Sequence, residues 1–215
     1  MNFRQFSARF SDRFFLSSKD ILALEDDPQI LRNQLNRWVK ADLLIRLKKG
    51  LYVFSADEKR RNIPLAATSS VMLAPSYISL EYALGIHGLI PEYVADVTAV
   101  TTLKPCRIRN ILGTFVYRHL QSSCFRGFQS VKYSNGVWFL AEAEKAVVDF
   151  LYFQLASFKD NKVREILEGS YRFQNIAELD AEKIVFWGKL FNSPKLIRVV
   201  NELSTWIREE KQGYD

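Results

Sequence analysis

The residue types best suited to chemistry gather in residues 29–54, QILRNQLNRWVKADLLIRLKKGLYVF. At 100° per residue, a helix over residues 28–41 collects amide and basic side chains on one face, namely Gln29, Arg32, Asn33, Asn36, Arg37 and Lys40. Amide side chains can pair with adenine edges and Arg with guanine, whereas basic side chains at the flanks meet phosphates. No acidic residue follows Asp27 on this helix. We therefore predict that this face contacts a polyanion, with double-stranded DNA as the best fit.

The opposite face of the helix carries the apolar stripe that a core-facing helix needs, made by Leu31, Leu35, Trp38 and Val39. The next segments, LLIRL and LYVF, are β-like, and Lys49-Gly50 supplies a tight turn between them. This hairpin adds three cations, and we expect Arg46, Lys48 and Lys49 to lie beside the DNA backbone or the minor groove.

The elements that must position these residues lie just before them. Residues 2–13 are predicted as a first helix, and the serines of SSKDILALE can cap a second, short one. Pro28 suits the first position of the third helix, and Asp27 is a good cap before it. Three helices followed by a hairpin describe a winged helix-turn-helix, which we assign to residues 1–60.

The charge distribution agrees with this assignment. Residues 1–62 hold 13 Lys and Arg against 8 Asp and Glu, whereas residues 63–215 hold 17 against 16. Nearly all of the formal net charge of +6 therefore lies in the first third of the chain, as in a module that faces a polyanion. The polar segment ADEKRRN, residues 56–62, is the expected linker.

Residues 61–215 are predicted to form an α+β domain with an antiparallel sheet and a helical C-terminal tail. PLAATSSVMLA is helical in pattern, and Ser79 is expected to cap a helix that ends at Gly88. Four β-rich segments follow, DVTAVTT, GTFVYRHL, FQSVKY and GVWFL, and Asn135-Gly136 marks a hairpin between the last two. Beyond them the pattern is helical to about Lys211.

The sequence offers little for catalysis. His87 lies at a predicted helix end and His119 on a predicted, partly buried strand, and neither has a recognisable Ser, Cys or metal-ligand companion. Glycine loops that cradle phosphates are absent. In AEAEKAVVD the two glutamates fit the first turn of a helix, and Ala143 stands two residues before Lys145, where a restriction-type nuclease needs an acid. We predict a non-enzymatic protein with no catalytic residue, cofactor or metal.

Composition indicates where the protein works. Cys106 and Cys124 cannot form a disulfide framework and lack zinc-ligand spacing. No run of about 18 apolar residues is present, and the charged N-terminus MNFRQFSARFSDRFF does not fit a secretory signal. We therefore expect a cytoplasmic protein with no membrane contact.

Several segments together resemble the AbiEi family, the antitoxins of type IV toxin–antitoxin and abortive-infection systems, also described as regulators of viral defence. The resemblance rests on RLKKGLYVF, on PSYISLEYALGIHGLIPE followed by VTAVTT, on GTFVYRHL, and on AEAEKAVVDFLYF, which together sample roughly residues 28–155. Ala143 departs from the family pattern, which has a proline there. The tail after Ala156 carries no part of the resemblance.

The resemblance implies a winged-helix domain that binds repeats in its own promoter, and a second domain needed for antitoxicity. It also implies a partner toxin resembling a nucleotidyltransferase, which the antitoxin need not touch. By position, the reading helix falls on residues 28–41 and the wing on residues 46–52. Four further positions match family motifs, Ser79, Glu144, Lys145 and Asp149. For these we expect structural roles, with a helix cap at the first and a helix-start charge pair at the next two.

The resulting prediction is a sequence-specific DNA-binding repressor of its own transcription, acting as the antitoxin of a phage-defence module. Two other classes stay open. One is an enzyme that modifies nucleic acid or nucleotides through the second domain, and the other is a protein-interaction module that uses GFQSVKY or the helical tail.

Overall fold

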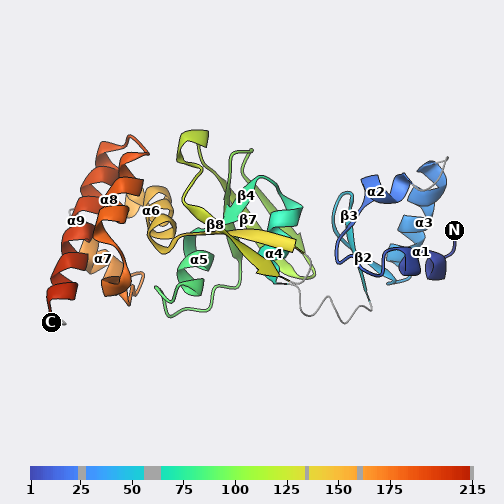
Figure 1. The fold of residues 1–215 in the computed structure, drawn as a ribbon, viewed down its shortest axis with the longest axis horizontal. Helices are drawn as coiled ribbons and strands as arrows, with labels where there is room; N and C mark the ends of the chain where they lie inside the picture. The colour runs from blue at the N-terminus through green and yellow to red at the C-terminus, as the bar shows by residue number, and fades with distance from the viewer. Residues whose placement is uncertain (24–27, 56–63, 134–135, 159–161, 214–215) are drawn as a thin grey trace.

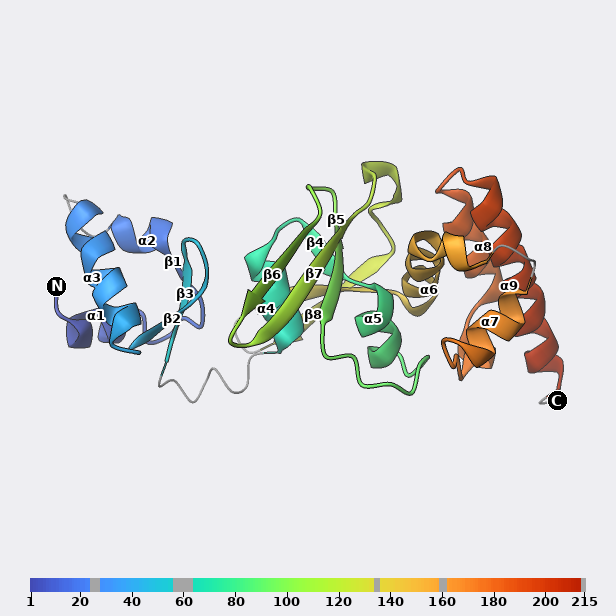
Figure 2. The same ribbon diagram turned by 180° about the vertical axis from the view of Figure 1, so that it is seen from behind.

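The computed structural model describes residues 1–23, 28–55, 64–133, 136–158 and 162–213. The fold is mixed α+β, and the two termini lie at opposite ends of its long axis (Figures 1 and 2). The predicted linker, the predicted cap Asp27 and the turn residue Asn135 lie outside the described residues.

Within the described part of residues 1–55, helices pack on one side of a small antiparallel sheet with the strand order β1-β3-β2. In chain order the elements are α1 (Phe3–Arg9), β1 (Leu16–Ser17), α2 (Ser18–Leu22), α3 (Pro28–Lys40), β2 (Leu44–Lys48) and β3 (Leu51–Phe54). The three predicted helices and the two predicted strands are all present. The strand β1 was not predicted, because two residues are too few to show an alternating pattern.

The apolar stripe of α3 lies in the core, as predicted. Leu31, Leu35 and Trp38 are buried, and Val39 is half-buried. The Trp38 ring packs against that of Phe6 on α1, with centroids 4.6 Å apart. This aromatic contact fixes the rotation of α3, so its polar face points outward.

The following residues build a second sheet with the order β6-β7-β5-β4-β9-β8. Its elements are α4 (Leu65–Met72), β4 (Ser76–Ile78), α5 (Leu80–Ile86), β5 (Val97–Thr101), β6 (Cys106–Asn110), β7 (Gly113–His119), β8 (Phe128–Tyr133) and β9 (Gly136–Ala141). The prediction of an antiparallel sheet was only partly right, because the sheet is mixed. β4 with β5, β6 with β7 and β8 with β9 pair antiparallel, whereas β4 with β9 and β5 with β7 pair parallel. β6 pairs on the far side of β7, which leaves β5 and β7 as parallel neighbours.

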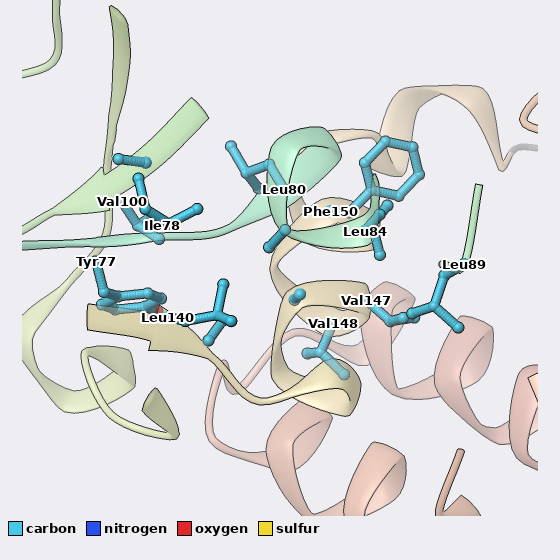
Figure 3. Packing of buried hydrophobic residues seen from close by; sticks show 14 of the residues in the cluster. Tyr77, Ile78, Leu80, Leu84, Leu89, Val100, Leu140, Val147, Val148 and Phe150 are labelled. Atoms are coloured by element: carbon cyan, nitrogen blue, oxygen red, sulfur yellow. The ribbon is translucent and has the colours of Figure 1, made fainter. Parts of the chain in front are cut away.

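Helices cover one end of this sheet. α6 (Ala143–Phe153) lies between the sheet and a helical group made by α7 (Val163–Gly169), α8 (Ala181–Lys189) and α9 (Pro194–Gln212) (Figures 1 and 2). Figure 3 shows how Tyr77 and Ile78 of β4 and Leu140 of β9 pack near Val147 and Val148 of α6. The predicted helical tail is therefore present, docked on the sheet through α6.

The hairpin from Leu44 to Phe54 is shared between two hydrophobic clusters. Side chains alternate between the two faces of a strand. Leu44 and Tyr52 face the cluster of residues 1–55, whereas the other face joins the cluster of residues 64–213 through Ile45, Leu47, Leu51 and Val53. Burial on both faces explains why LYVF is a continuous apolar run rather than an alternating one. We call this element the shared hairpin.

Candidate nucleic-acid interface

The predicted reading face of α3 is exposed along its length. All six side chains are solvent-accessible, namely Gln29, Arg32, Asn33, Asn36, Arg37 and Lys40. The first turn of α3 carries no acidic residue. The helix thus presents a row of amides and cations outward, with its anchor side buried.

The amides at the start of α3 are connected to one another. Gln29 Nε2 donates to Asn33 Oδ1 over 3.2 Å, and the Arg32 guanidinium donates to Gln29 Oε1 over 3.3 Å. Such i,i+3 and i,i+4 contacts hold neighbouring side chains on one helix face. The three side chains therefore form one ordered hydrogen-bonding group.

The turn of the shared hairpin is fixed against α2. Gly50 has a φ of +80°, and a Cβ there would lie 2.9 Å from Ser18 Oγ. The backbone N–H of Ser18 donates to the Gly50 carbonyl over 2.8 Å. Glycine is required here, because other residues adopt this backbone region only with strain. The contact places exposed Lys49 next to the helices.

The helix and the hairpin meet at a hollow of about 230 Å³, which we call the basic hollow. Its cations come from α3, β2 and the hairpin turn, as Arg32, Arg46 and Lys49. It is lined in addition by Ser18, Leu22, Leu35, Asn36, Gly50 and Tyr52. The structure thus brings together side chains that were predicted as separate reading and wing sites. Ser18 and Tyr52 were not predicted, because neither carries a charge or lies on the polar face of α3.

Lys48 differs from the other predicted DNA contacts. Its side chain is half-buried, and its ammonium donates a hydrogen bond to the Met72 carbonyl at the end of α4. Nearby, Asn110 Nδ2 donates to the Leu47 carbonyl over 3.2 Å. Lys48 and Leu47 therefore tie the hairpin to residues 64–213, whereas Lys49 points away from that contact into the basic hollow.

The second part contains a buried polar cluster of Tyr77, Ser79, Lys145 and Asp149, each with 0% of its surface exposed. Ser79 Oγ and Tyr77 Oη both donate to Asp149 Oδ2, over 2.8 and 2.9 Å. The Lys145 ammonium donates to Asp149 Oδ1 and, over 2.9 Å, to Tyr77 Oη. The pKa of Tyr77 is raised well above 10.0, chiefly because the side chain is buried and secondly because the Asp149 carboxylate is adjacent. The Tyr77 hydroxyl therefore keeps its proton and acts as a donor.

Two expectations for these residues were wrong. Ser79 occupies the N-cap position of α5 without a capping hydrogen bond. Thr98 Oγ1 instead accepts from the Tyr82 N–H, because the Ser79 hydroxyl is used by Asp149. Lys145 pairs with Asp149 one turn later rather than with Glu144, which accepts from the Asp180 N–H over 3.0 Å.

The histidines and cysteines do not form a reactive group. His87 Nε2 lies 2.8 Å from the Ala141 carbonyl, in line with its predicted structural role. His119 is exposed rather than partly buried, because its strand β7 ends there. Cys106 is exposed and Cys124 is buried, and both are free thiols.

The described residues contain no group of three or more His, Cys, Asp and Glu side chains that could hold a metal ion. Their helices include none with both the length and the apolar character that a membrane span requires. Compared with known proteins, the sequence matches no protein-family model and no curated protein.

Proposed function

We propose that this protein is a sequence-specific DNA-binding regulator of transcription. Residues 1–60 are its winged helix-turn-helix domain, α3 is the reading helix, and the hairpin of β2 and β3 is the wing. The order α1-β1-α2-α3-β2-β3 supports this proposal, because it presents one helix and one hairpin turn on the same side. Residues 61–215 form the second, α+β domain.

The single observation that carries the proposal is a polar, basic surface that runs without a break from α3 to the hairpin. Exposed amides and cations of α3 continue into the cations of the hairpin through the basic hollow, and none of its described lining residues is acidic. Base edges are read by amide and guanidinium groups, whereas phosphates are met by cations on either side. Gln29 and Asn33 are the proposed base-reading pair, with Arg37 and Lys40 further along the helix on the backbone.

The test compares binding of two labelled duplexes by fluorescence anisotropy. One duplex spans the region upstream of the gene for this protein, and the other is a random sequence of equal length. We expect preference for the upstream duplex, and Asn33→Ala should reduce that preference by about 1–3 kcal/mol. The matched control is Gln129→Ala, which removes an exposed amide from β8. Equal binding of both duplexes by the wild type would contradict sequence-specific regulation.

We further propose that the regulator is a cytoplasmic repressor and the antitoxin of a phage-defence pair. The support is the resemblance of four segments to the AbiEi antitoxins. The partner would be a nucleotidyltransferase-like toxin, neutralised without a requirement for direct contact. Co-expression with such a toxin from the adjacent reading frame should restore growth, and Asn33→Ala should leave this rescue intact. Continued growth arrest with the intact antitoxin present would contradict the antitoxin role.

An enzyme is the less favoured alternative. Lys145 and Asp149, the charged residues closest to a catalytic arrangement, are fully buried and already satisfied by each other and by two hydroxyls. A substrate has no access to them in this arrangement, so we propose a non-enzymatic second domain. Metal-dependent turnover of a nucleic acid or nucleotide that is lost in Glu144→Ala would overturn this choice.

A further inference from the structure

We infer that the basic hollow is the binding site for one backbone phosphate of duplex DNA. This inference rests on the proposed function and deepens it, because it names the ligand group and the side chains that hold it. Arg32, Arg46 and Lys49 are the proposed phosphate ligands. They come from α3, β2 and the hairpin turn, and all three side chains line the same hollow.

The charge of the hollow is unbalanced. None of its described lining residues is acidic, and among the described residues Arg32, Arg46 and Lys49 form no ion pair. Some arginines elsewhere on the surface do pair, as Arg13 does with Asp20, whereas the hollow brings three cations together with no acidic side chain in its described lining. Like charges held close together repel one another. An anion between the three cations would remove this repulsion.

The chemistry of the lining suits a tetrahedral phosphate. Guanidinium groups bind phosphate through two parallel N–H donors, and an ammonium adds a compact charge. Neutral donors line the same hollow, since Ser18 and Tyr52 bring hydroxyls and Asn36 brings an amide. Leu22 and Leu35 form its apolar wall, which limits competition by water.

The position of the hollow favours a phosphate of duplex DNA over a free anion. Arg32 and Asn36 belong both to the hollow and to the exposed face of α3. Arg32 also donates to Gln29, which in turn contacts Asn33. A phosphate held by Arg32 would therefore sit one hydrogen bond away from the proposed base-reading amides. Such a contact fixes the register of the helix on the duplex.

The decisive experiment places single neutral methylphosphonate linkages along the upstream duplex and measures binding to wild type and to Arg46→Gln. One linkage should weaken wild-type binding about tenfold, as expected for a lost charged hydrogen bond. The same linkage should have little further effect on Arg46→Gln, because the phosphate ligand is already missing. Lys49→Gln should show the same coupling at the same linkage.

The control is Arg9→Gln, which removes an exposed cation of α1 outside the hollow. It should respond to every linkage as the wild type does. If the wild type binds DNA but no linkage is coupled to Arg46 or Lys49, the phosphate site is wrong and the proposed function stands. If the wild type binds no duplex, the proposed function itself fails. Saturable binding of inorganic phosphate without DNA, lost in Arg46→Gln, would assign the hollow to a free anion instead.

Discussion

At the scale of single residues, the most tightly constrained group is the buried cluster around Lys145 and Asp149. Each charge is removed from water, and each has its hydrogen-bonding capacity met by the other charge and by Tyr77 or Ser79. A buried ion pair adds little net stability, whereas removal of one partner leaves an uncompensated charge. The cluster therefore ties α6 to β4 in one arrangement.

The two charges should depend on each other in unfolding experiments. We expect Lys145→Met to lower the free energy of unfolding by about 3–5 kcal/mol, because Asp149 is left buried without its cation. Adding Asp149→Leu should recover part of this loss. Urea unfolding followed by circular dichroism measures both variants. Single losses that simply add in the double variant would contradict the coupling.

Asp180 gives a prediction about pH. Its carboxylate caps α8 by accepting from the backbone N–H groups of Glu182 and Lys183. The Lys183 N–H is the chief cause of a lowered Asp180 pKa. Because the folded pKa lies below the unfolded one, this stabilisation is present above about pH 4 and is lost as the pH falls through the folded pKa.

Asp180→Ala should therefore cost about 1 kcal/mol at neutral pH, with the difference from wild type shrinking in acid. Asp180→Asn is the matched control, because it keeps an acceptor for the helix N-terminus without a titrating charge. Urea midpoints measured across the acid range give the comparison. A constant difference between wild type and Asp180→Ala at every pH would refute the titration of the cap.

At the scale of elements, sequence periodicity was enough for α3 and not for the sheet of the second part. The spacing of Leu31, Leu35 and Trp38 defines a helix and its buried side without knowledge of any partner. The partners of Asp149 are different, because Tyr77 and Ser79 lie 72 and 70 residues away in sequence. The parallel pairing of β5 with β7 was equally hidden, since alternation within a strand does not specify its neighbour.

Sequence alone also could not distinguish the roles of two adjacent lysines at the hairpin turn. Lys48 and Lys49 have the same side chain and were predicted to have the same role, but Lys48 contacts Met72 whereas Lys49 lines the basic hollow. We expect Lys49→Gln to reduce the salt dependence of DNA binding by about one phosphate contact. Lys48→Gln should leave that dependence unchanged and lower the free energy of unfolding instead. Equal salt dependence in the two variants would contradict this division.

At the scale of the whole molecule, the proposed reading surface and the second part are joined through the shared hairpin. Ile45, Leu47, Leu51 and Val53 bury one of its faces with residues 64–213, and two hydrogen bonds, from Lys48 and Asn110, border the contact. The two views of Figures 1 and 2 agree that β2 and β3 lie on the side of the N-terminal part that faces α4. The position of the hairpin turn is therefore set from both sides.

This sharing has a consequence for any attempt to transfer residues 1–55, the part that carries the proposed reading helix, to another protein. The polar composition of residues 56–62 suggests a site at which the chain could be divided. Division there would expose four apolar side chains of the hairpin on one fragment, and Met72 and its neighbours on the other. Both fragments would carry exposed apolar patches and would tend to aggregate. Aggregation would be avoided in a hybrid that keeps the second part. It would also be avoided by polar substitutions at the four exposed positions, Ile45, Leu47, Leu51 and Val53. The segment that can be transferred intact is therefore larger than the part that carries the proposed DNA contacts.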